Sequence, residues 1–231
     1  MSNHLHIVVH MSPSTANAWS SEEVAMRWTQ LYPARTVELC AEKIAAILEN
    51  PEIVAEYRTR LANLSWLMKS LSEPIARKAN AEDKVTGRFW EGRVGCQALL
   101  SEKSILAAMA YADLNPLRAK IASNIATSRY TSVKLRSQQL IKNPERANQP
   151  LMLLVGVRSF NLSGISEADY IELVDFTGRK LHPGKRGKIE ASKPKALTKL
   201  GLDKNHWTTR VKGIGSGYWR VIGGWLGNWR S

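Results

Sequence analysis

The sequence feature that most constrains the fold is a helical pattern that begins after Ser101 and ends near Pro116. Ser101 is a favourable N-cap residue, and Glu102 lies in the first turn, where a carboxylate interacts well with the helix dipole. Apolar residues then recur at helical spacing, at Ile105, Leu106, Met109 and Ala110. We therefore expect one face of this helix to pack in the core of a folded domain.

A second face of the same helix carries Tyr111 and Asn115 one turn apart, so these two side chains project together. Pro116 disfavours helical geometry at Asn115 and lacks a backbone donor, so we expect the helix to end or kink just past the pair. Two interpretations of Tyr111 stay open. It is either an ordinary half-buried aromatic residue beside a helix stop or a reactive phenol, and the pattern alone favours the ordinary residue.

Further helices are expected in the first 80 residues, where apolar positions recur at helical spacing, and Ser20 or Ser21 before Glu22 and Glu23 is a favourable N-cap for the first of them. The expected helices run from Ser20 or Ser21 to Pro33, from Val37 to Leu48, from Pro51 onward and from Leu64 to about Ala79. The stretch from Arg88 to Val94 alternates enough to predict a strand or a short hairpin. Arg88 and Arg93 flank aromatic residues there, which suits phosphate contact and base stacking as well as ordinary surface packing.

The N-terminal residues from His4 to His10 are rich in β-forming residues and predict a strand. In a strand His4 and His6 share one face and are close enough to bind one divalent metal, with a third ligand from elsewhere in the fold. The alternative is that these histidines are bystanders at a chain end, where order is commonly poor.

The 231 residues carry a net charge of +13. Residues 1–178 hold 20 basic and 18 acidic residues, whereas residues 179–231 hold 13 and 2, so the excess lies near the C-terminal end. A chain this basic is expected to bind nucleic acid. A membrane is the weaker candidate, because no long basic amphipathic helix stands out in the sequence. Cys40 and Cys96 do not have the spacing of a metal site. No apolar run reaches the length of about 18 residues that a membrane-spanning helix needs, so we expect a cytoplasmic protein.

The C-terminal part is expected to be a polar linker followed by a basic extension. Ser166 and Asp169 form a capping box for a short helix that runs to Phe176 and closes at Gly178. From Arg179 onward, basic residues interleave with tryptophans and glycines, which suits sequence-tolerant binding of single-stranded DNA. The alternative is a loosely packed tail whose charge only keeps it in solution. The residues expected to contact nucleic acid are Arg88, Arg93, Arg118, Lys185, Arg186, Lys188 and Trp207.

Three sequence elements follow one another along the chain. They are His4-Leu5-His6, the stretch from Gly87 to Arg93, and the run Tyr111-Ala112-Asp113-Leu114-Asn115-Pro116-Leu117-Arg118-Ala119. Together and in this order they resemble the single-tyrosine HUH transposases, in particular the REP-associated tyrosine transposases of bacteria and their longer relatives. The match covers about residues 1–135, and residues 169–175 and 185–187 are similar to the extension of longer members.

The resemblance implies a ferredoxin-like α+β domain that acts as a DNA transposase of a mobile element. His4 and His6 would lie on a central strand as ligands of Mg²⁺ or Mn²⁺, and Asn115 would give a third ligand. Tyr111 would be the nucleophile, forming a 5′-phosphotyrosine and a free 3′-hydroxyl on single-stranded DNA near hairpin repeats. A homodimer and association with a bacterial nucleoid are further expectations.

The chain begins three residues before His4, whereas family members have some tens of residues there, including a strand that pairs with the histidine strand. We therefore expect a catalytic domain at 1–135 that lacks its first strand, a linker at 136–165 and a basic, tryptophan-rich extension at 166–231. Two functions stay open. One is DNA cleavage and rejoining through Tyr111, and the other is DNA binding by a catalytically inactive remnant.

Overall fold

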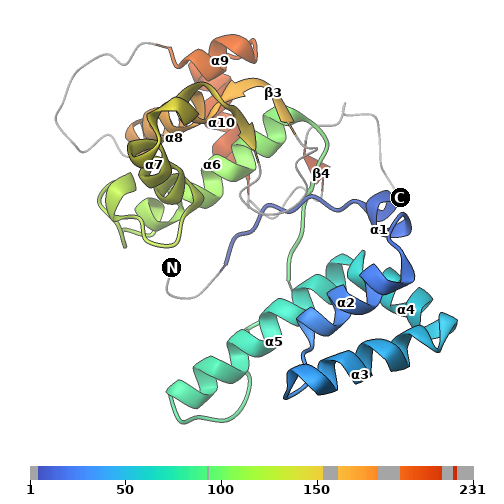
Figure 1. Cartoon of the computed structure of the whole chain (residues 1–231). Coiled ribbons are helices and arrows are strands. Elements are labelled where there is room, and N and C mark those ends of the chain that lie inside the picture. Colours follow the sequence, from blue (N-terminus) through green and yellow to red (C-terminus); the bar gives the residue numbers. More distant parts are fainter. Residues whose placement is uncertain (1–4, 93, 153–160, 182–192, 215–220, 223–231) are drawn as a thin grey trace, which may run out of the picture. The chain divides into compact units, whose positions relative to one another are not determined.

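A computed structural model describes residues 5–92, 94–152, 161–181, 193–214 and 221–222 of the chain. It divides into two compact units, one made of Val9–Gly95 and the other of Met1–Val8 together with Cys96–Ser231 (Figure 1). We call them the helical unit and the tyrosine unit. The boundary at Gly95 falls inside the segment 1–135 that was expected to form one catalytic domain.

The helical unit consists of helices, and side chains cap the N-termini of its four long ones. Ser20 accepts a hydrogen bond from the Glu23 backbone at 3.2 Å, and Thr36, Asn50 and Asn63 cap the next three long helices in the same way. The four predicted helices are confirmed as α2 Ser21–Leu31, α3 Val37–Leu48, α4 Pro51–Leu61 and α5 Leu64–Glu82. The short helix α1 Pro13–Asn17 was not predicted.

Aromatic rings form much of the core of the helical unit. Trp28 on α2 is 7% exposed and stacks on Tyr57 of α4, with ring centroids 3.9 Å apart. Trp66 of α5 meets the same indole edge-on at 6.0 Å, and the Arg60 guanidinium covers Trp66 at 4.2 Å. Trp28 and Trp66 therefore serve packing.

The tyrosine unit contains short strands and longer helices. The strands form two pairs, in which β1 runs parallel to β4 and β2 runs antiparallel to β3. Two 3₁₀ turns, η1 Ile125–Thr127 and η2 Pro144–Asn148, flank α7. The bounds are β1 Ala98–Leu99, α6 Glu102–Arg118, α7 Ser132–Lys142, β2 Pro150–Met152, β3 Asn161–Ser166, α8 Glu167–Leu181, α9 Lys195–Lys199, α10 Lys204–Gly213 and β4 Val221–Ile222.

Helix α6 is the central element of the tyrosine unit, and α8 and α10 pack against it (Figure 1). Ser101 caps it as predicted, and Pro116 lies inside the helix, which continues to Arg118. Gly178 of α8 lies where the two helices approach closely, because a Cβ atom there would be 3.1 Å from Cδ2 of Leu114. The buried apolar residues of α6 are Leu106, Ala107, Ala108, Met109, Ala110 and Leu114.

The expected ferredoxin-like α+β fold is wrong for the described residues, which are mostly helical and contain only two-stranded pairs. Residues 5–10 form no strand, and residues 88–92 form none either. A strand needs backbone partners on a neighbouring strand, and local β propensity does not supply them. The loop near Arg88 is instead held to α5, since Asn80 donates to the Gly87 carbonyl and the Trp90 indole to the Ser72 carbonyl.

The expected linker at 136–165 contains the greater part of α7, all of β2 and most of β3. The capping box before α8 is confirmed, since the Ser166 amide donates to Asp169 Oδ2 at 2.9 Å and the Asp169 amide donates to Ser166 Oγ at 3.2 Å. Helix α8 then passes Gly178 and ends at Leu181. The first part of the basic extension is therefore folded into the tyrosine unit.

Candidate active site around Tyr111

Tyr111 lies on α6 with its ring half-buried against the core of the tyrosine unit. The His6 ring meets it edge-on, with centroids 5.2 Å apart, although the two residues are far apart in the sequence. The Arg118 guanidinium lies over the Tyr111 ring at 4.3 Å from its centroid. One imidazole and one guanidinium therefore surround the phenol that the sequence singled out.

The arrangement around His6 partly follows the sequence expectation. Residues 5–9 alternate, with His6 and Val8 partly buried and Leu5, Ile7 and Val9 exposed, so the predicted face is turned toward the protein without forming a strand. Val8 packs against the core of the tyrosine unit, which places His6 beside α6.

The expected metal ligands are placed only in part. Asn115 lies one helical turn beyond Tyr111 and is 5% exposed, and His6 contacts the Tyr111 ring. His4 lies outside the described residues. Within the described part of the chain, no three His, Cys, Asp or Glu side chains gather in a way that could hold a metal ion. The described imidazole and amide are suitable donors for a divalent ion, but they are two of the three expected ligands.

The described residues expected to contact nucleic acid belong to two different units. Arg118 lies at Tyr111, whereas Arg88 is exposed in the helical unit. Arg93, Lys185, Arg186 and Lys188 lie outside the described residues.

The expectation for Trp207 is corrected by its position in the core. Its ring is 0% exposed, and its indole nitrogen donates to Thr177 Oγ1 at 2.8 Å. A nucleobase therefore has no exposed face of this ring to stack on. Helical spacing on α10 places the ring against α6 and α8, which overrides the basic composition of the segment.

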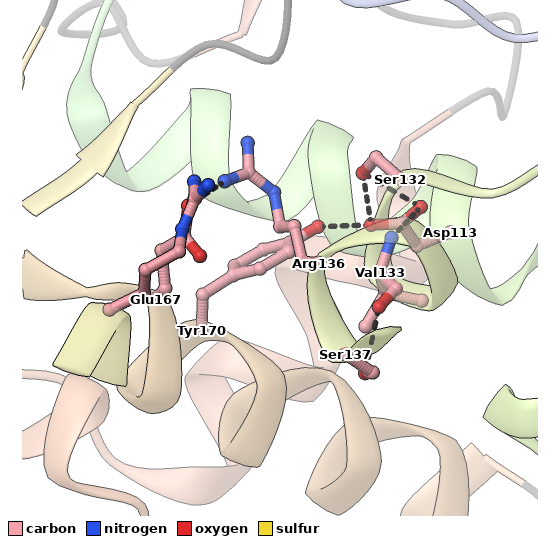
Figure 2. A network of polar contacts seen from close by, with 8 residues as sticks. Asp113, Ser132, Val133, Arg136, Ser137, Glu167 and Tyr170 are labelled. Atoms are coloured by element: carbon pink, nitrogen blue, oxygen red, sulfur yellow. Dashed lines mark hydrogen bonds and ion pairs between the residues drawn. The ribbon is translucent and has the colours of Figure 1, made fainter. Parts of the chain in front are cut away.

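Asp113, between Tyr111 and Asn115, is the polar centre that the sequence analysis missed (Figure 2). Its carboxylate is 3% exposed and accepts from Ser132 Oγ at 2.7 and 2.9 Å. It also accepts from the Val133 amide at 3.1 Å and from the Tyr170 hydroxyl at 2.6 Å. A signal was present, because Asp113 follows Leu106 by seven residues and Met109 by four, and so lies on the apolar face.

The carboxylate of Asp113 caps helix α7 from another helix. The N-cap residue of α7, Thr131, makes no side-chain capping bond of its own. Asp113 satisfies the amide of Val133 in the first turn and places a negative charge at the positive end of the helix dipole. The motif that contains Tyr111 therefore also fixes the start of α7.

The neighbourhood of this network includes a phenol with a raised pKa, Tyr170, and a buried carboxylate, Glu167, that forms two ion pairs. Burial raises the pKa of Tyr170 well above its usual value of 10, and the adjacent Asp113 carboxylate raises it further. Glu167 is 2% exposed and pairs with Arg136 at 3.1 Å and Arg146 at 3.0 Å. These groups hold α7, α8 and η2 together.

Comparison of this chain with protein-family models, with curated proteins and with solved structures gives no match. Among the described residues, no helix is both long and apolar enough to cross a membrane.

Proposed function

We propose that this chain acts on DNA, with Tyr111 as the group that attacks a phosphodiester. The observation that supports the proposal is the meeting of three groups. The rings of His6 and Tyr111 are in edge-to-face contact and Arg118 covers the phenol, so an imidazole, a phenol and a guanidinium lie together.

In the proposed reaction, Tyr111 Oη forms a bond to phosphorus while the bond from phosphorus to the 3′-oxygen breaks. The phenolic proton passes to water, and the 3′-oxygen takes up a proton to become a hydroxyl. Arg118 pairs with the phosphate oxygens, because a guanidinium presents several donors in one plane. A divalent ion held with His6 and Asn115, such as Mg²⁺ or Mn²⁺, would supply additional charge at the phosphate.

The 5′-phosphotyrosine keeps the energy of the broken ester in a covalent bond. Attack by a new 3′-hydroxyl reverses the step and joins two strands, so DNA transposition needs no nucleotide cofactor. Single-stranded DNA is the expected substrate, and association with the bacterial nucleoid belongs to the same proposal.

The proposal is tested with single-stranded oligonucleotides labelled at the 3′ end, since the protein would remain attached to the 5′ end of the downstream fragment. We expect a covalent adduct on denaturing gels for the parent with Mn²⁺ or Mg²⁺, and none for the parent with a chelator or for Tyr111→Phe under any of these conditions. Tyr57→Phe in the helical unit is the matched control, because it removes the same oxygen from another half-buried ring. An adduct with Tyr111→Phe would refute the assignment.

The second candidate is DNA binding without cleavage. The observation that favours it is that Tyr111 packs against the core while the described residues lack the ferredoxin-like sheet. A parent protein that binds labelled DNA in every metal arm and forms no adduct would support this function and contradict the first.

A further inference from the structure

A second aromatic residue, Tyr130, stands apart from the site around Tyr111. It precedes α7 and is 97% exposed, and its backbone has a φ of 60°, in the left-handed region that bulky residues rarely adopt. Strained residues of this kind persist where the surrounding structure holds them, and they occur often at ligand-binding sites. The ring of Tyr130 contributes nothing to the core of the described residues.

The segment around Tyr130 is held in place on both sides. Before it, the Asn124 and Thr127 side chains form a capping box, and Ser128 Oγ donates to the Asn124 carbonyl at 2.9 Å. After it, Thr131 Oγ1 donates back to the Ser128 carbonyl at 2.9 Å, and Asp113 holds the first turn of α7. The outward position of the ring is therefore built into the loop.

Among the described residues, the hollow beside Tyr130 is lined by the cations Arg129 and Lys134 and by no carboxylate. Residues 114–144 contain six Lys and Arg and no Asp or Glu. Of these six, Arg136 is buried against Glu167, whereas Arg129 is exposed and Lys134 partly exposed. Tyr130, Arg129, Lys134 and Gln138 line one hollow of about 550 Å³ at the start of α7. We call these four residues the Tyr130 surface.

We propose that the Tyr130 surface binds an unpaired nucleotide of single-stranded nucleic acid. The Tyr130 ring stacks on the base, Arg129 and Lys134 contact the neighbouring phosphates, and Gln138 reaches the base edge. A duplex does not fit this chemistry, because its base faces are covered by neighbouring bases. The nature of the partner rests on the proposed action on DNA, whereas binding at this surface does not depend on cleavage at Tyr111.

The test measures the affinity of the full-length chain for fluorescein-labelled oligothymidine of about 12 nucleotides by anisotropy, at about 0.2 M salt to weaken general electrostatic binding. We expect Tyr130→Ala to weaken binding roughly tenfold and Tyr130→Phe to bind within about twofold of the parent, because stacking needs the ring and not the hydroxyl. Arg129→Ala and Lys134→Ala should weaken binding more than Lys142→Ala, which removes the same charge near the other end of α7.

A second readout keeps the proposal falsifiable if other basic segments dominate the affinity. Oligonucleotides carrying 5-iodouracil, irradiated on the protein, should cross-link to the tryptic peptide Tyr130–Lys134. If Tyr130→Ala weakens the binding of oligothymidine alone, the Tyr130 surface binds DNA. If it weakens the binding of oligouridine equally, the surface binds single strands of either kind. Unchanged single-strand affinity of Tyr130→Ala together with no cross-link in this peptide would overturn the proposal, as would an equal loss of duplex binding. A parent protein that cross-links normally through this peptide but forms no adduct at Tyr111 would contradict only the proposed cleavage.

Discussion

Asp113 joins three helices through one carboxylate. It belongs to α6, caps α7 through Ser132 and Val133, and accepts the hydroxyl of Tyr170 from α8. Hydrogen bonds to a charged group that is shielded from water contribute more than neutral ones, and removing the acceptor leaves every donor without its partner. This residue therefore controls the packing of the helix that also carries Tyr111.

We expect Asp113→Ala to lower the free energy of unfolding by about 3–5 kcal/mol, since it breaks a buried charged network. Chemical denaturation followed by circular dichroism measures the change. Asp175→Ala on α8 is the control, because its carboxylate is half-exposed and its ion-pair partner among the described residues is Arg179 of the next turn. The control should change stability by about 0.5 kcal/mol or less. Equal effects of the two substitutions would show that the network contributes little.

We expect the buried phenol of Tyr170 to make the folded protein less stable at high pH. Its pKa is raised in the folded state by burial and by Asp113, so the folded protein keeps the proton above pH 10 while the unfolded chain releases it. The stabilising contribution is complete below the unfolded pKa of about 10 and falls by about 1.4 kcal/mol per pH unit above it.

The comparison between the parent and Tyr170→Phe isolates this effect from lysine titration. Denaturation curves from about pH 9 to 11 should show a steeper fall in unfolding free energy for the parent. At neutral pH the variant should be less stable by about 1.5–3 kcal/mol, the contribution of a hydrogen bond to a charged group. Parallel pH profiles would contradict the buried, neutral phenol.

At the scale of elements, the contact between α6 and α8 depends on the absence of a side chain at position 178. A Cβ atom there would lie 3.1 Å from Leu114 Cδ2 and 3.6 Å from Leu117 Cδ2. The helices can therefore pack closely only while this position is glycine or the leucine side chains move.

Gly178→Val should lower the unfolding free energy by about 1–3 kcal/mol, because the added methyl groups overpack the crossing of the two helices. Gly213→Val at the end of α10 is the control, since a Cβ atom there would meet no atom of the described residues within 4 Å. Thermal unfolding of both variants distinguishes overpacking from a general effect of valine in a helix. A stable Gly178→Val protein would mean that Leu114 and Leu117 adjust without cost.

At the scale of the whole molecule, the two units divide the charge unequally. The helical unit, Val9–Gly95, holds 11 basic and 11 acidic residues, so the tyrosine unit carries the entire net charge of +13. Deleting residues 179–231 cannot test this charge cleanly, because Leu197, Trp207 and Val211 belong to the core. Substitution of exposed lysines can test the contribution of this charge, because it leaves the core residues in place.

Replacing Lys180, Lys195 and Lys212 with Gln should weaken DNA binding and reduce the slope of log affinity against log salt by up to about 0.9 per contacted phosphate. Three cations of the helical unit serve as the matched control, changed together to Gln: Lys69, Arg77 and Lys78. The control should leave the slope unchanged. A larger change with the control would assign DNA contact to the helical unit.

The sequence by itself determined where most helices lie. Ser20 and Ser101 cap helices as predicted, and the long helices of the first 82 residues begin at or within a residue of the predicted positions. These features could be predicted because capping, the helix dipole and apolar spacing act between residues a few positions apart. Tyr111 and Asn115 share a helix turn for the same reason.

Only the tertiary structure decided what these helices and their side chains contact. The expected strand at His6 needed a partner strand, and Trp207 was buried by the packing of α10. The contact of His6 with Tyr111 and the capping of α7 by Asp113 join residues that are distant in the chain. Such contacts depend on how whole elements pack, and local propensity does not encode that arrangement.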